Sequence, residues 1–372
     1  MHKPVFSYVN VILLKEIGME KIKVGVLGLG RAGYRMHFPE LEKFPELFEI
    51  IAGCDNDPER RANVAESHPK VKLYENAADF VKDPDIELVT VATRTPLHVE
   101  HSVMALDAGK YVFNEKPIAV DYESALKLRD ADKRHPGKLF IRHNRRFEPA
   151  FEHIMSIIHS GKLGFVYEIK LRRNSYDWRA DWQTIQSCGG GQLLNWGPHI
   201  VDHAMRFLEG PVKDVWSDLK LVAARGDAED HVRIILRGEN DRVVDLEISG
   251  GCSLHEPVYV VNGTLGTLIS DNELRLHLKY INPAAPKPTF QATSANPPVR
   301  GGFGGGVKPE WIEDDIQTAP ASGDDTWKCW KYLYESIRNG AKFPVTLDEA
   351  LENMRVIDMV KKGTPVVNVR DR

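Results

Sequence analysis

The chain has 372 residues, of which 42% are hydrophobic and 27% are charged, and its formal net charge at pH 7 is −4. This length allows two or three domains with a sizeable core, and the composition is that of an ordinary globular protein. The net charge is small and the one basic stretch (142–146) is short, so we expect no nucleic-acid partner. No apolar run is long enough to span a membrane, so we expect no membrane partner either.

Residues 1–20 are expected to be an extension that precedes the compact fold. Polar residues interrupt their weak apolar stretch, and they lack a cleavage site of small residues and a twin arginine, so they do not resemble a secretory signal. The four cysteines lie far apart in the sequence, without a paired motif, as expected for reduced thiols. These cysteines are Cys54, Cys188, Cys252 and Cys329. The sequence therefore predicts a cytoplasmic protein.

Between residues 21 and 143, short apolar runs alternate with helical patterns. The runs lie at 23–30, 48–55, 87–93, 110–117 and 138–144. Continuous apolar strands separated by helices indicate a parallel sheet that is covered on both faces. We therefore predict an α/β domain over residues 21–143.

After residue 144 the pattern changes to that of a second domain, 144–372. A helix is predicted around 147–160, followed by runs with an apolar period of two at 164–173, 215–224, 231–237 and 243–251. Asn262-Gly263 indicates a hairpin, and successive strands without helices between them indicate a mainly antiparallel α+β domain. Residues 282–310, rich in Pro and Gly, are expected to form a long excursion, and two helices close the chain, the second with a capping box at Thr346 and Glu349.

The first strand leads directly into a glycine-rich turn of the form GxGxxG. This turn comprises Gly28, Leu29, Gly30, Arg31, Ala32 and Gly33, and a helical pattern follows it. In this context the first glycine permits the tight turn, the second lets the backbone approach a pyrophosphate, and the third lets the helix pack on the strand. The sequence therefore predicts a Rossmann dinucleotide-binding domain, with the cofactor bound at the start of a helix.

Asp55 ends the second strand and bears on the choice of cofactor. A carboxylate at this position can bind the two hydroxyls of the adenosine ribose, and it repels a 2′-phosphate. We therefore expect NAD. NADP stays open as the alternative, because Arg60 or Arg61 could turn to receive a phosphate.

Three further stretches carry a family resemblance. Asn114-Glu115-Lys116-Pro117 looks like the EKP element of the glucose–fructose oxidoreductase / inositol dehydrogenase (Gfo/Idh/MocA) family, and residues 143–147, HNRRF, are similar to the NRRF crossing of that family. Residues 189–203, GGGQLLNWGPHIVDH, resemble its triple-glycine segment, which ends in D-x-G-x-H-x-x-D. With the GxGxxG turn, the resemblance covers residues 20 to 372 in order.

The resemblance implies a Rossmann domain followed by a domain with an open, mainly antiparallel sheet, and an active site in the cleft between them. It implies sugars, cyclitols or their derivatives as substrates, and oligomers, here a homodimer or homotetramer, that form through the open sheet. Lys116 would sit beside the nicotinamide and hydrogen-bond the reacting hydroxyl, and Pro117 would follow a cis peptide. The further cofactor contacts that the resemblance implies are Thr93, Pro96 and Glu115.

Three interpretations compete for His199. His199 and His203 stand four residues apart, as metal ligands on one helical face can, but no third ligand has matching spacing, and we predict no metal site. A packed core histidine is the second interpretation. The third is an acid/base, because Pro198 suits the start of a helix, whose positive dipole end would keep the imidazole neutral.

The stretch departs from the family pattern at one position. Relatives usually have Asp four residues before the histidine, where this chain has Asn195, so the activity could be weakened or altered, unless Asp202 compensates. By the same resemblance, Trp178 and Arg179 in the loop before the triple glycine are expected to contact substrate together with Asp202. Lys116, His199 and Asn195 are the predicted catalytic residues.

The sequence thus predicts an NAD-dependent oxidoreductase that transfers hydride between nicotinamide and a secondary hydroxyl of a sugar, sugar acid or cyclitol. One alternative is an enzyme that holds NAD tightly and recycles it during epimerisation, elimination or glycoside cleavage. A second alternative is an NAD-binding regulator without catalytic activity, because Asn195 stands where relatives usually have an aspartate.

Overall fold

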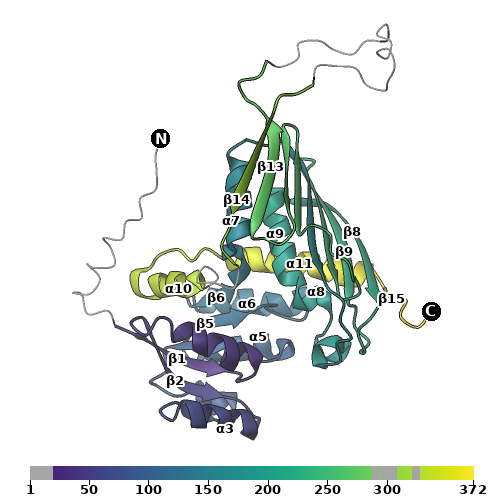
Figure 1. The fold of residues 1–372 in the computed structure, drawn as a ribbon. Coiled ribbons are helices and arrows are strands. Elements are labelled where there is room, and N and C mark those ends of the chain that lie inside the picture. The colour runs from purple at the N-terminus through teal and green to yellow at the C-terminus, as the bar shows by residue number, and fades with distance from the viewer. Residues whose placement is uncertain (1–19, 287–293, 295–307, 321–326) are drawn as a thin grey trace.

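A computed structural model describes residues 20–286, 294, 308–320 and 327–372. The expected extension, apart from Glu20, and most of the expected excursion at 282–310 lie outside the described residues. Figure 1 shows two sheet-containing parts, the first in purple and blue and the second mainly in green. In the part of the chain that the structure describes, no helix is long and apolar enough to cross a membrane.

The first sheet is parallel, and its six strands have the order β3-β2-β1-β4-β5-β6. The strands are β1 (Ile22–Leu27), β2 (Phe48–Cys54), β3 (Lys72–Tyr74), β4 (Leu88–Val91), β5 (Tyr111–Glu115) and β6 (Leu139–Arg142). This order reverses direction between β1 and β4, which is where doubly wound sheets bind their ligands. The predicted parallel sheet is confirmed; the short, partly exposed strand β3 was not predicted.

Helices connect these strands, and three of them begin at a polar residue whose side chain caps them. They are η1 (Gly33–His37), α2 (Phe38–Leu41), α3 (Pro58–Ser67), α4 (Ala77–Phe80), η2 (Thr95–Leu97), α5 (His98–Asp107) and α6 (Tyr122–Arg134). Asp57, Asn76 and Asp121 accept hydrogen bonds from amides in the first turns of α3, α4 and α6. Helix η1 is π-helical, so the helix after the glycine turn is wider than an α-helix at this point.

The second sheet is mixed and mainly antiparallel, with the order β14-β13-β12-β11-β7-β10-β9-β8-β15. Its strands are β7 (Val166–Asn174), β8 (Val212–Leu221), β9 (His231–Gly238), β10 (Val243–Ser249), β11 (Tyr259–Gly263), β12 (Gly266–Ser270), β13 (Arg275–Ile281), β14 (Trp311–Gln317) and β15 (Val366–Asn368). Only the pairs β7/β10 and β8/β15 run parallel. The predicted hairpin is present, but Asn262 and Gly263 are the last residues of β11 and the turn to β12 is formed by residues 264 and 265.

Helices pack on one face of this sheet, as Figure 1 shows for α9 and α11. The remaining helical elements are η3 (Asn144–Phe147), α7 (Pro149–His159), η4 (Trp182–Thr184), η5 (Gln186–Cys188), α8 (Gln192–Asn195), α9 (Gly197–Leu208), α10 (Lys328–Asn339) and α11 (Leu347–Gly363). On β10, Val244, Leu246 and Ile248 are buried toward α9, because alternate residues of a strand face the same side. The predicted capping box at Thr346 and Glu349 is present at the start of α11.

Helix α10 returns to the first sheet, although the sequence assigned it to the second domain. The ring of Trp330 is fully buried, lies edge-on to Phe48 and Phe113, and donates a hydrogen bond to Glu40 at 2.7 Å. Arg338 of the same helix pairs with Glu87. Helix α10 therefore packs its aromatic side chains in the core and attaches this part of the chain to the Rossmann sheet.

Candidate active site

A cleft of about 1180 Å³ runs along the carboxyl ends of β1, β2, β4 and β5 and under the segment that leads to α9. Carboxyl ends of parallel strands meet at one edge of a sheet, which brings residues far apart in the sequence to a common site. Of the predicted site residues, the cleft is lined by Gly28, Gly30, Arg31, Ala32, Asp55, Thr93, Glu115, Lys116, Arg179, Asn195 and His199. Gly33, Pro96, Trp178 and Asp202 are not among its lining residues.

The glycine turn has the geometry that a phosphate cradle requires. Gly28 has a φ of +98°, and a Cβ there would lie 2.6 Å from the carbonyl oxygen of Ala92. A Cβ on Gly33 would lie 1.8 Å from the carbonyl oxygen of Gly28, so Gly33 serves the packing of helix on strand rather than the cleft. At Gly30 the nearest atom is 3.6 Å away, on the Arg60 guanidinium, which leaves room for a pyrophosphate. The residues present fit a dinucleotide.

Asp55 is fixed at the end of β2 by backbone amides. Its Oδ2 accepts from the amide of Leu29 at 2.8 Å and its Oδ1 from the amide of Asp57 at 3.0 Å. Arg60 also reaches Oδ2, at 3.3 Å, and nearly half of its side chain is exposed. The carboxylate and a partly exposed cation thus stand side by side where the adenosine ribose of a dinucleotide would bind.

The loops after β4 and β5 are joined by His98, the first residue of α5. Its two ring nitrogens lie 2.9 Å from the carbonyl oxygen of Thr93 and 2.7 Å from that of Pro117. Thr93 lines the cleft, whereas Pro96 packs near Gly189. The peptide bond between Lys116 and Pro117 is cis, as expected.

Glu115 is buried in a network of charges rather than being free in the cleft. Its Oε1 accepts from Arg142 at 2.6 Å and lies 2.9 Å from Nε2 of His37. Burial alone would raise the pKa of Glu115, but Arg142 and His37 hold that pKa well below its usual range. Its Oε2 accepts from the backbone amide of Lys116 at 3.1 Å, so Glu115 orients the residue that follows it.

The side chain of Lys116, which belongs to the Rossmann domain, contacts the second domain. Its Nζ donates to the backbone carbonyl of Asn195 at 3.0 Å. Burial lowers the pKa of Lys116 from 10.5 to about 8; Glu115 opposes this shift, and Arg145 adds to it. An amine with this pKa exchanges protons near neutral pH, as an acid/base group must.

His199 lies in the first turn of α9 and faces the cleft. Burial is the main reason that its pKa lies well below 6.5, and the positive charges of Lys116 and Arg145 lower the pKa further. The ring is therefore neutral, as predicted, although burial rather than the helix dipole is the leading cause. Its buried Nδ1 has no hydrogen-bond partner among the described residues.

Two other histidines next to His199 serve the packing. His203 stacks on Phe151 at a centroid distance of 4.0 Å and places Nε2 2.9 Å from the carbonyl oxygen of Arg145. Burial lowers the pKa of His143 to about 4 and that of His203 to about 3. Among the described residues, no group of three or more His, Cys, Asp or Glu side chains is arranged to hold a metal ion.

Asp202, which the sequence placed at the substrate, pairs with Arg146 instead. Arg146 donates to its two carboxylate oxygens at 2.6 and 2.7 Å, and the aspartate is 1% exposed. Burial opposes ionisation, but this pair lowers the pKa of Asp202 to about 2. The geometry gives no support to a substrate contact, and Asp202 cannot replace the carboxylate that Asn195 lacks.

Trp178 and Arg179, the two residues of the loop before the triple glycine that were expected to contact substrate, lie in different surroundings. Trp178 is 64% exposed and stacks with Arg225 at 5.3 Å, away from the residues that line the cleft. Arg179 does line the cleft, with Nε donating to Asp181 at 2.7 Å and Nη2 to Gln183. Arg179 therefore keeps its predicted place, and Trp178 does not.

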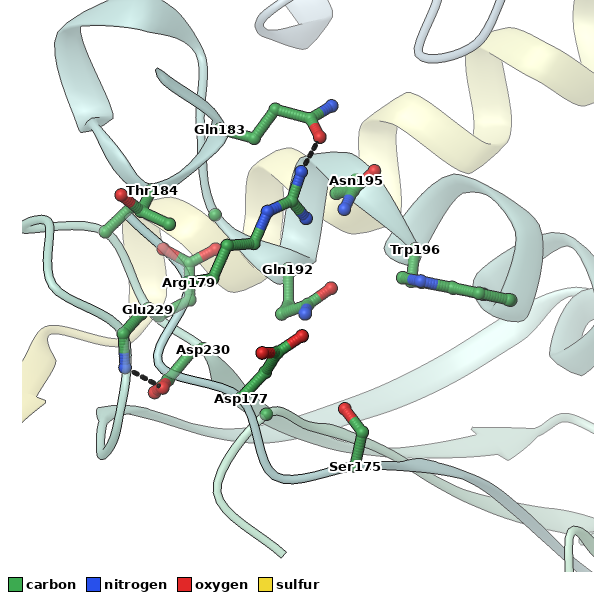
Figure 2. Close-up of a pocket in the computed structure, with 14 residues that line it drawn as sticks. Ser175, Asp177, Arg179, Gln183, Thr184, Gln192, Asn195, Trp196, Glu229 and Asp230 are labelled. Carbon is green, nitrogen blue, oxygen red and sulfur yellow. Dashed lines mark hydrogen bonds between the residues drawn. The ribbon is translucent and has the colours of Figure 1, made fainter. Parts of the chain in front are cut away.

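A smaller cavity of about 140 Å³, here called the side pocket, adjoins the cleft (Figure 2). It is lined by Ser175, Asp177, Arg179, Gln183, Thr184, Gly191, Gln192, Asn195, Trp196, Ala224, Ala228, Glu229, Asp230 and Gly250. Burial raises the pKa of Glu229 to about 7, and its Oε1 accepts from the amide of Leu193 at 3.0 Å. Glu229 could not be found from the sequence, since the turn that carries it holds no recognisable motif.

Comparison with known proteins agrees with this geometry. Residues 22–143 match the family model described as "Oxidoreductase family, NAD-binding Rossmann fold", and residues 151–269 match the GFO/IDH/MocA C-terminal domain. An oxidoreductase of Schizosaccharomyces pombe is 32% identical over 68% of this chain and 71% of its own length. The scyllo-inositol 2-dehydrogenase (NADP(+)) IolW of Bacillus subtilis is 26% identical over 93% of this chain and 94% of its own.

Solved structures show the same fold. An NAD-binding protein from Listeria innocua superposes with a TM-score of 0.76 at 22% identity, over 92% of this chain and 94% of its own. An oxidoreductase from Thermotoga maritima gives a TM-score of 0.75 at 19% identity, over 91% of this chain and 95% of its own. With both family models matched in order and the dinucleotide cradle in place, the chain belongs to the GFO/IDH/MocA family of NAD(P)-binding oxidoreductases.

Proposed function

We propose that the protein transfers hydride between a nicotinamide and a secondary hydroxyl of a sugar or cyclitol. The observation that carries this proposal is the meeting of Lys116 with Asn195 and His199 in the same cleft that holds the glycine turn. A bound nicotinamide supplies a hydride acceptor in the oxidised form and a hydride donor in the reduced form. The protein then has to orient the alcohol and move one proton.

Lys116 is the better proton acceptor of the two candidates. Its pKa of about 8 is close to neutral pH, whereas the pKa of His199 is too low for that ring to hold a proton there. In oxidation, the hydroxyl proton passes to neutral Nζ while the hydride leaves the same carbon; in reduction, the ammonium returns the proton. His199 stays neutral and offers a ring nitrogen that orients the hydroxyl.

For the cofactor, we propose NAD. Asp55 presents a buried carboxylate to the adenosine ribose, and a 2′-phosphate there would meet a like charge. Arg60 is the residue that opposes this preference, because its guanidinium lies over Gly30 and is partly exposed. One relative, the scyllo-inositol 2-dehydrogenase of Bacillus subtilis, is named as NADP-dependent, so membership of the family does not decide between the two cofactors.

We also propose a homodimer or homotetramer that forms through the open face of the second sheet. The strand register puts Trp216, Ile235, Val260 and Ile269 on one face, in a row that also contains Asp245 on β10 and Lys170 on β7. Trp216 is 53% exposed and Ile269 36% exposed on this face. A monomer in sedimentation analysis at micromolar concentration would contradict this proposal.

The function is tested by mixing the protein with NAD and a panel of cyclitols and neutral sugars while NADH absorbance is followed. We expect one NADH for each substrate molecule oxidised, in several turnovers. Product formation without net NADH would instead indicate a recycled cofactor. Tight NAD binding with no product from any panel member would indicate the regulator.

A further inference from the structure

The side pocket contains a buried hydrogen-bond acceptor that has no partner. Oε1 of Gln192 is buried and has no hydrogen-bond partner among the described residues. Figure 2 shows the side chains of Gln192 and Asp177 pointing into the pocket from different elements. An unsatisfied buried acceptor is costly, so a group that donates a hydrogen bond into this pocket gains more than the same group gains in water. The pocket therefore favours a ligand that carries a donor.

The side pocket opens onto the place where the reacting hydroxyl would bind. Arg179, Gln183, Asn195 and Trp196 line both the side pocket and the cleft. Asn195 is also the residue whose carbonyl oxygen lies 3.0 Å from Nζ of Lys116. A substrate oxidised at Lys116 can therefore extend one substituent past Asn195 into the pocket.

The volume limits the size of that substituent. A cavity of roughly 150 Å³ holds a benzene-sized group, and the side pocket measures about 140 Å³. A hydroxymethyl group fits with room for water, whereas a second sugar ring of about twice the size of benzene does not. The pocket thus suits a small polar group on a single ring.

The charges in the pocket disfavour an anion. Its one basic lining residue, Arg179, is neutralised by Asp181, to which it donates at 2.7 Å. The carboxylate of Asp230 accepts from three amides, those of residues 222, 223 and 224. Asp177 adds a further carboxylate, whereas Glu229, whose pKa burial raises to about 7, is only partly ionised at neutral pH. A carboxylate on the substrate would therefore be desolvated among like charges.

We infer that the side pocket is a substrate subsite that binds an uncharged, hydroxyl-bearing substituent, with Gln192 as the acceptor that determines specificity. The inference rests on the proposed function and narrows its substrates to neutral sugars or cyclitols with a small hydroxylated side group, excluding sugar acids.

Three probes that share one ring separate the possibilities. D-glucose carries a hydroxymethyl group, D-xylose has hydrogen in its place, and D-glucuronate has a carboxylate. Their dissociation constants are measured by calorimetry on the NADH-loaded protein, for the wild type, Gln192→Met and the control Gln317→Met. Gln317 is an exposed residue of β14, the edge strand of the second sheet, and does not line the pocket. NADH formation from the same sugars and NAD is recorded in parallel.

We expect glucose to bind roughly tenfold tighter than either other probe, as one well-placed hydrogen bond to a buried acceptor provides. In Gln192→Met, the affinity for glucose should fall to that for xylose. The affinity for xylose should change less than about twofold, since methionine keeps the side-chain length. The control should match the wild type. Tighter binding of glucuronate, equal weakening of glucose and xylose, or no binding of any probe would overturn the subsite. Binding in the expected order without NADH formation would count against hydride transfer alone.

Discussion

The Nζ atom of Lys116 lies 3.0 Å from the backbone carbonyl oxygen of Asn195, and this hydrogen bond joins the two domains at the bottom of the cleft. It places the amine that exchanges protons next to the residue at which the chain departs from its family pattern. Because the contact uses the backbone of Asn195, it does not depend on whether an asparagine or an aspartate stands there. The side chain at position 195 can therefore change without loss of this hydrogen bond, and its charge is expected to shift the pKa of Lys116.

The first prediction concerns the pH dependence of oxidation. Only neutral Lys116 can accept the hydroxyl proton, so kcat/KM for alcohol oxidation should rise with pH through an apparent pKa of about 8, and reduction should fall through the same range. Asn195→Asp adds a negative charge that favours the ammonium form, and should move this pKa up by roughly one unit. Rate profiles from pH 6 to 10 check both; an unmoved profile in Asn195→Asp would contradict the coupling.

The second prediction concerns Asp202 and Arg146. Asp202→Asn removes one of the two carboxylates that pair with the buried Arg146 guanidinium. It should lower the free energy of unfolding by about 3 kcal/mol, as the loss of one partner of a buried ion pair does. The control Asp214→Asn, at an exposed ion pair, should change it by less than about 1 kcal/mol. Urea denaturation measures both. A stable Asp202→Asn protein with a raised KM would instead restore the substrate role.

The third prediction concerns Glu229 and the pH dependence of stability. Its folded pKa of about 7 exceeds the ordinary value of 4.5, so the folded state binds more protons than the unfolded state between these values, and stability falls as pH rises through this window. The loss should be about 3 kcal/mol in all. Glu229→Gln should remove this part of the pH dependence, whereas Glu239→Gln, at an exposed site, should keep it. Denaturation at pH 4.5, 6 and 7.5 provides the comparison.

The fourth prediction concerns the cofactor. Asp55→Asn removes the charge that repels a 2′-phosphate but keeps an acceptor for the backbone amide of Leu29. The ratio of kcat/KM for NAD to that for NADP should fall about tenfold, which corresponds to ~1.4 kcal/mol. Wild-type protein that already prefers NADP would show that Arg60 sets the cofactor choice.

Local patterns predicted much of this structure. The glycine turn at residue 28, the aspartate at the end of β2 and the proline at the start of α9 each follow from a short stretch whose backbone requirements are strict. The parallel sheet followed from apolar runs that alternate with helices. These features could be predicted because their causes lie within a few residues of one another.

Long-range partners could not be predicted. Asp202 looked available for substrate because its partner, Arg146, is 56 residues away, and the bond between Trp330 and Glu40 spans 290 residues. Trp178 is on the expected loop but turns out to solvent. Glu229 acquires its raised pKa mainly from burial under the segment at Gly191, where a Cβ would lie 2.1 Å from its Oε1. No periodicity or motif contains such information.

The central claim is that Lys116 moves the proton during hydride transfer, and single-turnover kinetics with Lys116→Met test it most directly. The variant is mixed with NAD and an oxidisable polyol from the panel, with NADH affinity measured alongside and Lys138→Met, a surface lysine of the same domain, as the control. The account predicts a hydride-transfer rate lower by roughly 10²–10⁴-fold, with NADH affinity within about threefold of wild type. A Lys116→Met protein that transfers hydride within tenfold of the wild-type rate would contradict it.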